Sequence, residues 1–128
     1  MLYNVIERVN PLDITAPRKF YAVANADRVA DLRMVAKTIS RETNFSTAEV
    51  QSAIESFLMV IPRLLVEGYT VKLGEFGSFR LSISSQGAAT REEFNPSLIN
   101  GVNLIFRAGK EFDKELRDVE FQKVSPSV

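Results

Sequence analysis

Two short segments near the start of the chain have side chains that favour β-strands. Residues 2–9 (LYNVIERV) and residues 18–25 (RKFYAVAN) are rich in β-branched and aromatic residues. Between them lie Pro11 and Pro17, which have no backbone N–H to donate to a strand ladder and therefore mark a turn region. We predict a β-hairpin here and interpret it as an added structural element.

At about residue 27 the spacing of apolar residues changes to that of a helix. Up to residue 43 they recur at i, i+3, i+4 and i+7, which predicts a first helix with Asp27 or Asp31 as its N-cap. These apolar positions are Leu32, Val35, Ala36 and Ile39.

A second helix is predicted from Ser46 to Glu67. Ser46 followed three residues later by Glu49 is a capping-box pattern, and Gly68 suits the left-handed conformation that ends many helices. Pro62 is expected to kink this helix or loosen its last turns, because it removes a backbone donor. The apolar face is wider than one small neighbour can cover, so we expect a partner subunit to bury the remainder. Its members are Val50, Ile54, Phe57, Leu58, Ile61 and Leu65.

The stretch VKLGEFGSF, residues 71–79, combines strand-like alternation with two glycines. Apolar and polar residues alternate on both sides of Gly74 and Gly77, which predicts two antiparallel strands joined by a tight glycine turn. The turn carries an aromatic residue, Phe76, at its tip. The apolar positions of the two strands are Val71, Leu73, Phe79, Leu81 and Ile83.

After the second strand the chain makes an excursion of about sixteen residues without a clear period, which indicates a long exposed arm. A returning strand follows, with apolar residues alternating up to Phe106. Residues 108–118 predict a short last helix with Phe112 and Leu116 one turn apart, and residues 119–124 predict a final short strand.

The elements together predict an α+β fold in the order ββ–αα–ββ–β–α. We divide the chain into an N-terminal hairpin extension, residues 1–26, and a main domain, residues 27–128. The last four residues, 125–128 (SPSV), are expected to fray.

Composition removes several classes of function. The chain has no cysteine and no histidine, which excludes thiolate zinc sites, disulfides and most nucleophilic triads, so we expect no enzyme, metal or cofactor. No apolar run approaches the roughly 18 residues of a membrane span, and the start lacks a signal-peptide pattern, so a cytoplasmic location is expected. Sixteen Lys and Arg balance sixteen Asp and Glu, so net charge favours neither nucleic acid nor membrane.

Two motifs give the sequence a family resemblance. The pattern G-x-F-G-x-F ends at Phe79, and an F-R-x-G-K pattern begins 27 positions later at Phe106 and opens the last helix. With two helices before them, these motifs over residues 28–118 resemble the bacterial histone-like HU / integration host factor family. The N-terminal hairpin lies outside the basic family pattern, so the chain resembles a longer variant.

This resemblance implies an intertwined homodimer with a two-helix base, a three-stranded sheet with a long β-arm, and a C-terminal helix. Proteins of this kind bind duplex DNA without sequence specificity, approach its minor groove with their arms, and condense it in the nucleoid. In the dimer interface the resemblance places Phe57, Phe76, Phe79 and Phe106. On DNA it places Lys72, Gly74, Gly77, Arg80, Arg91, Asn95, Pro96, Arg107, Lys110 and Lys114.

The arm departs from the family pattern. Residues 84–100 contain one basic residue, Arg91, and two acidic ones, Glu92 and Glu93, so the formal charge is −1. The family's Asn-Pro pair remains as Asn95 and Pro96, but well past the midpoint of the arm. Two interpretations of Pro96 follow: a wedge between base pairs, or a plain turn or bulge proline. On the last helix, Glu111–Lys114 and Asp113–Arg117 are candidate ion pairs.

Three functions are compatible with parts of this pattern. The first is non-specific architectural DNA binding. The second is a dimeric protein-interaction or structural module of the same fold with little DNA affinity, which the neutral charge and acidic arm favour. The third, a helix-turn-helix over residues 31–67, fits poorly because the second helix is too apolar for a major groove.

Overall fold

The computed structural model describes residues 1–124, so the predicted frayed end at residues 125–128 lies outside the described residues. The chain forms two compact units, one from Met1–Ala30 with the segment that begins at Leu116, the other from Asp31–Glu115. In the part of the chain that is described, no helix combines the length and the apolar character required to cross a membrane.

The first unit is a three-stranded sheet in the order β2-β1-β6. Strands β1 (Leu2–Arg8) and β2 (Lys19–Ala24) form the predicted hairpin, antiparallel from Tyr3↔Ala24 to Arg8↔Lys19. The predicted last strand, β6 (Gln122–Lys123), pairs in parallel with the start of β1. None of the described residues of this unit is buried.

Two helices begin the second unit. Helix α1 spans Leu32–Glu42, because Asp31 is its N-cap and accepts a hydrogen bond from the Met34 N–H at 2.9 Å. A start near Asp27 was therefore wrong by several residues. Helix α2 spans Thr47–Val66 and is capped by Ser46, whose Oγ accepts from the Glu49 N–H at 3.1 Å.

The end of α2 confirms the predicted glycine stop. Gly68 has φ +98°, its N–H donates to the Leu65 carbonyl, and the Tyr69 N–H donates to the Leu64 carbonyl. This pair of bonds is a Schellman motif, which satisfies carbonyls that the helix end leaves free. Pro62 lies inside α2, which continues to Val66.

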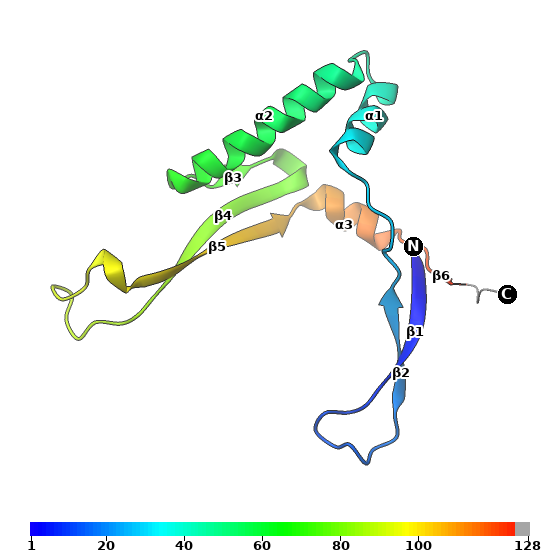
Figure 1. Ribbon diagram of the computed structural model, residues 1–128, viewed down its shortest axis with the longest axis horizontal. Coiled ribbons are helices and arrows are strands. Elements are labelled where there is room, and N and C mark those ends of the chain that lie inside the picture. Colours follow the sequence, from blue (N-terminus) through cyan, green and yellow to red (C-terminus); the bar gives the residue numbers. More distant parts are fainter. Residues whose placement is uncertain (125–128) are drawn as a thin grey trace. The chain divides into compact units, whose positions relative to one another are not determined.

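The second sheet has the order β3-β4-β5. Strand β3 (Val71–Lys72), the 3₁₀ turn η1 (Gly74–Phe76) and β4 (Gly77–Ser85) form the predicted glycine hairpin. The arm turns back through η2 (Pro96–Leu98) into β5 (Ile99–Ala108), and α3 (Lys110–Arg117) follows. In Figure 1, α2 lies along this sheet and α1 packs against α2.

Little of this unit is buried within one chain. The buried apolar side chains of the described residues are Ala36, Val50, Leu65 and Val71. No large side chain among them is fully buried, and α2 leaves Leu58 and Met59 54 % and 72 % exposed. On the predicted apolar face of α2, Val50 and Leu65 are buried and Phe57 and Leu58 are exposed, so the chain itself covers this face only in part.

The glycine turn and the start of α3 are held together by direct backbone contact. The Gly109 N–H donates to the Phe76 carbonyl at 2.9 Å, and a Cβ at Gly109 would overlap the backbone carbonyl of Glu75. At Gly77, with φ +147°, a Cβ would meet the Arg107 carbonyl oxygen at 2.5 Å. Glycine is required at both positions because neighbouring backbone atoms leave no room for a Cβ atom.

Gly109→Ala should lower the free energy of unfolding by about 1–3 kcal/mol, because the backbone of Glu75 cannot move away without breaking the turn. Gly87→Ala is the matched control: no atom lies within 4 Å of its Cβ position, so a change below about 0.5 kcal/mol is expected. Chemical denaturation of both variants measures the difference. Equal stability of the two would contradict this account of Gly109.

Candidate nucleic-acid interface

The β3-β4-β5 sheet has two chemically different faces. Paired residues point to the same side and successive residues to opposite sides, so the strand register assigns each side chain to a face. One face is apolar and lies toward α2, where it borders a groove of about 300 Å³ with almost purely apolar walls. Residues of the groove include Phe57, Leu58, Ile61, Phe79, Leu81 and Leu104.

The opposite face, called the polar face below, carries cations and small polar side chains. Lys72 pairs with Ser78, and Ser78 with Arg107, so these residues form one row across three strands. Arg80 lies in the next row opposite Ile105. Toward the arm tip the rows contain Ser82, Asn103, Ser84 and Gly101.

The polar face is electropositive although the chain is neutral. Strands β3, β4 and β5 contain Lys72, Arg80 and Arg107 and no acidic residue, so their formal charge is +3. All three side chains are exposed. Among residues 1–124 the only ion pair joins Arg18 to Glu7 at 4.0 Å, so Lys72, Arg80 and Arg107 form no ion pair with a carboxylate.

The same result corrects the expectation for α3. Glu111–Lys114 and Asp113–Arg117 do not form ion pairs in the described structure. Lys110 and Lys114 are exposed, but Glu111 and Asp113 in the first turn of α3 lie between them in the sequence. The cations of α3 are therefore interspersed with acids, whereas those of the polar face are not.

Four phenylalanines pack together beside the turn. The Phe76 ring lies 4.8 Å from that of Phe112 and 5.8 Å from that of Phe106, and Phe79 lies 4.7 Å from Phe106. Phe76 therefore packs on α3 and β5 of its own chain, yet remains 45 % exposed. The sequence pattern predicts Phe112 only as an apolar position of the last helix, and its place in this cluster is not indicated by any local pattern.

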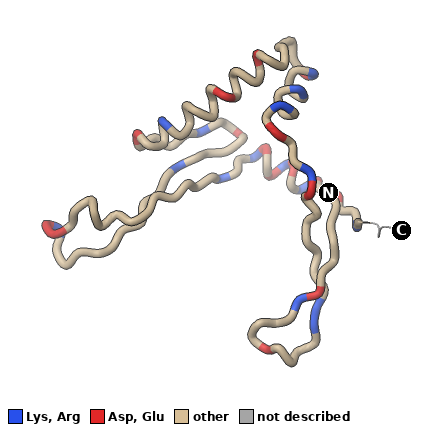
Figure 2. Tube along the Cα trace, in the orientation of Figure 1, with Lys and Arg blue, Asp and Glu red and all other residues tan. Residues whose placement is uncertain are grey.

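The predicted site residues of the arm lie apart from the polar face. Asn95 caps η2 by accepting from the Ser97 N–H at 3.0 Å, and Pro96 occupies the first position of η2. Arg91 is followed directly by Glu92 and Glu93. Figure 2 shows these tip charges at the far end of the arm from the body. Strand pairing therefore brings Lys72, Arg80 and Arg107 together and leaves the arm residues separate.

The glycines Gly74 and Gly77 both have positive φ, +56° and +147°. Gly77 is required by its contact with β5, whereas the space at Gly74 is open. That their N–H groups receive a phosphate stays a prediction.

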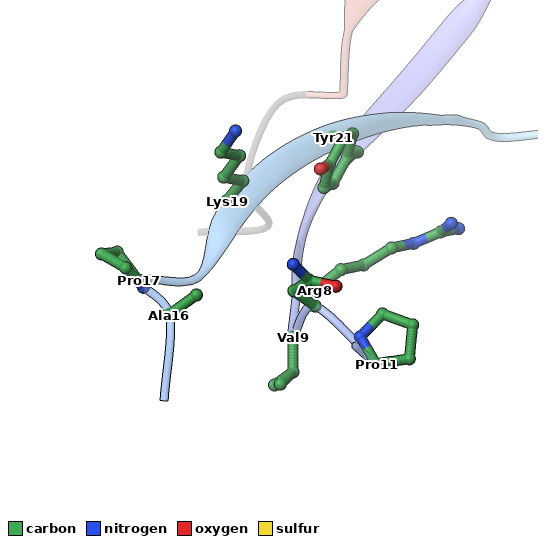
Figure 3. Close-up of a pocket in the computed structure, with 8 residues that line it drawn as sticks. Arg8, Val9, Pro11, Ala16, Pro17, Lys19 and Tyr21 are labelled. Atoms are coloured by element: carbon green, nitrogen blue, oxygen red, sulfur yellow. The ribbon is translucent and has the colours of Figure 1, made fainter. Parts of the chain in front are cut away.

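A second group of cations lies on the N-terminal hairpin. Arg8 and Lys19 are cross-strand partners beside Tyr21, whose ring centre is 5.9 Å from the Arg8 guanidinium, and they border a pocket of about 550 Å³. Figure 3 shows the Arg8 and Lys19 head groups pointing away from each other. The pocket therefore lacks converging polar groups. Residues 1–124 also contain no cluster of three or more carboxylates placed to hold a metal ion.

Comparison with known proteins gives a family match and a structural neighbour. The HU-HIG family model, described as an HU domain fused to a wHTH, Ig or glycine-rich motif, matches residues 1–123, including the hairpin. A crystal structure of a candidate bacterial DNA-binding protein from Bacteroides vulgatus superposes with a TM-score of 0.62 at 12 % identity. The match covers 96 % of this chain and 48 % of that one, so the chain spans about half its length. No functionally curated protein matches.

Phe112→Ala should destabilise the second unit by about 2 kcal/mol, less than the roughly 3–5 kcal/mol of a fully buried phenylalanine, because Phe112 is half-buried. Phe45→Ala is a suitable control, since this side chain is 61 % exposed and makes no aromatic contact in the described chain. Thermal unfolding compares the two. A larger loss for Phe45→Ala would contradict the role given to the four-ring cluster.

Proposed function

Because the chain belongs to the HU-HIG family of HU-type domains, we propose that it is a non-enzymatic protein that binds duplex DNA and acts architecturally as a homodimer. Its arms approach the minor groove, and it contributes to DNA condensation in the cytoplasmic nucleoid. The observation that carries this proposal is the polar face, where three exposed cations meet no acid. Residues 27–128 form the DNA-binding domain, and residues 1–26 are an appended hairpin.

Cations of this kind bind the phosphate backbone. Each phosphate contact by Lys72, Arg80 or Arg107 releases counterions, and this gain does not depend on base sequence. Ser78 lies between Lys72 and Arg107, and Ser82 follows Arg80 on the same face. Both side chains are short, so a phosphate backbone meets little steric obstruction from them. The proposed binding is therefore non-specific.

The body of the domain supplies most of the affinity in this proposal. Lys110 and Lys114 extend the contact from α3, where neighbouring acids weaken it. The arm tip repels phosphate through Glu92 and Glu93, so Arg91 and Asn95 contribute little. We assign Pro96 the role of a turn residue, because it begins η2 after the Asn95 cap.

The small core supports the proposed homodimer. Four buried apolar side chains cannot balance the conformational entropy of a chain this long. A second copy would cover the groove between α2 and the sheet, with Phe57, Phe76, Phe79 and Phe106 at the interface. Phe57, Phe76 and Phe106 are each between 41 % and 45 % exposed in the single chain. Stable interfaces of this type bury about 2,000 Å² or more.

The neutral net charge and the acidic arm tip favour a second candidate, a dimeric interaction module with little DNA affinity. The two candidates share the fold and the dimer and differ in the polar face. If the second candidate holds, the cations of the polar face are ordinary surface charges. Their removal then leaves the affinity for DNA unchanged.

The double variant Lys72→Gln with Arg107→Gln should bind random duplex more weakly, by the same factor for all sequences. The slope of log K against log salt should become shallower by about 1.8, which corresponds to the loss of two phosphate contacts. Arg8→Gln with Lys19→Gln, on the hairpin, removes the same charge and should leave the slope nearly unchanged. Fluorescence anisotropy at several salt concentrations measures both. Equal slopes for the two double variants would refute the role of the polar face.

Leu58→Glu should produce monomers and strongly reduce stability, because it places a charge in the groove where the partner is proposed to pack. Leu12→Glu is the matched control, since Leu12 is 95 % exposed on the hairpin loop. Sedimentation velocity over a range of protein concentrations distinguishes the species. A stable folded monomer of the unchanged chain at micromolar concentration would rule out the obligate dimer.

A further inference from the structure

Helix α1 carries a line of positive charge that the polar face does not include. Arg33, Lys37 and Arg41 lie at i, i+4 and i+8, so they follow one side of the helix, and all three are exposed. Figure 2 shows the line as blue segments along α1. We call these three residues the α1 stripe.

The α1 stripe is unfavourable for the helix itself. Like charges one turn apart repel each other, and no acidic residue lies three or four positions from any of the three. Arg33 also lies in the first turn, which holds no acidic residue and where the helix dipole disfavours a cation. None of the three forms an ion pair within residues 1–124. Arg41 lies in the last turn, where the helix dipole favours a cation, so the dipole cost falls on Arg33 alone. A row of unpaired like charges that repel one another is suited to an anionic partner.

The stripe and the polar face lie on different sides of the domain. Helix α2 packs on the β3-β4-β5 sheet, and α1 packs on α2, whereas the polar face looks away from the helices (Figure 1). The other side of α1 is buried or half-buried and carries Leu32, Ala36 and Ile39. A straight duplex on the polar face therefore does not reach the stripe.

We propose that the α1 stripe binds the phosphate backbone of a second duplex, so that the protein bridges two DNA segments. At a rise of about 1.5 Å per residue the stripe is about 12 Å long, and one DNA strand presents a phosphate every 3.4 Å or so along its axis. The stripe therefore spans a length of duplex over which each strand carries three to four phosphates. An acidic protein surface has the same charge and is treated as an outcome of the test.

This inference rests on the proposed DNA binding and is tested by capture of two duplexes. One short duplex is immobilised, the protein of residues 1–128 is added, and retention of a second, fluorescent duplex is measured. In parallel, anisotropy gives the affinity for a single duplex. The test variant carries Arg33→Gln, Lys37→Gln and Arg41→Gln, since glutamine keeps helix propensity and length without charge.

The unchanged protein should retain the second duplex, and three contacts predict that its binding weakens about 40-fold between roughly 50 and 200 mM salt. The stripe variant should retain at most about one tenth as much of the second duplex as the unchanged protein. Its affinity for a single duplex should stay within about twofold of the unchanged protein's affinity. The matched control, Arg8→Gln with Arg18→Gln and Lys19→Gln, loses the same charge and should retain the second duplex normally.

Four results would overturn the proposal. If the unchanged protein binds one duplex and retains no second, bridging is wrong and the proposed function stands. If the stripe variant loses single-duplex affinity as much as retention, the stripe belongs to the first DNA site. If the variant sediments with an altered oligomeric state, the stripe contacts protein. If the unchanged protein binds no duplex at all, the proposed function and this inference both fail.

Discussion

One hydrogen bond, from the Gly109 N–H to the Phe76 carbonyl, joins the glycine turn to the start of α3. It requires two backbones to approach so closely that neither Gly77 nor Gly109 has room for a side chain. With this contact in place, the Phe76 ring packs on β5 and α3 and supports the register of β5 beside β4. A slip of one residue would turn Arg107 to the apolar face, so the positive surface depends on this contact.

The net charge of this protein does not describe its local electrostatics, because positive and negative side chains lie on different surfaces. At physiological salt a phosphate responds to charges within about 8 Å, so it meets the local charge of a surface and not the sum over the chain. The polar face attracts phosphate while Glu92 and Glu93 repel it at the arm tip. A neutral chain can therefore hold a polyanion near its body and keep it from the end of its arm.

Sequence patterns located what is decided locally. The Ser46 cap, the Gly68 stop, the glycine hairpin and the alternation of β4 and β5 each follow from a few neighbouring residues. The N-cap of α1 stayed open between Asp27 and Asp31 because both are good caps in sequence, and the Met34 hydrogen bond confirms Asp31. The polar face was also hidden, because Lys72 and Arg107 become neighbours only through Ser78. The Gly109 contact and the pairing of β6 with β1 likewise join distant segments.

The parallel pairing of β6 with β1 has a consequence for the order of folding. A two-stranded hairpin is marginally stable by itself, and the third strand of its sheet, which begins at Gln122, is made long after β2 ends at Ala24. Everything that the second unit needs within one chain is synthesised in between. On the ribosome the sequence of the second unit is therefore complete before the hairpin can gain its third strand, whose recruitment closes a long loop. The completed first sheet thus marks a chain whose synthesis has passed residue 123.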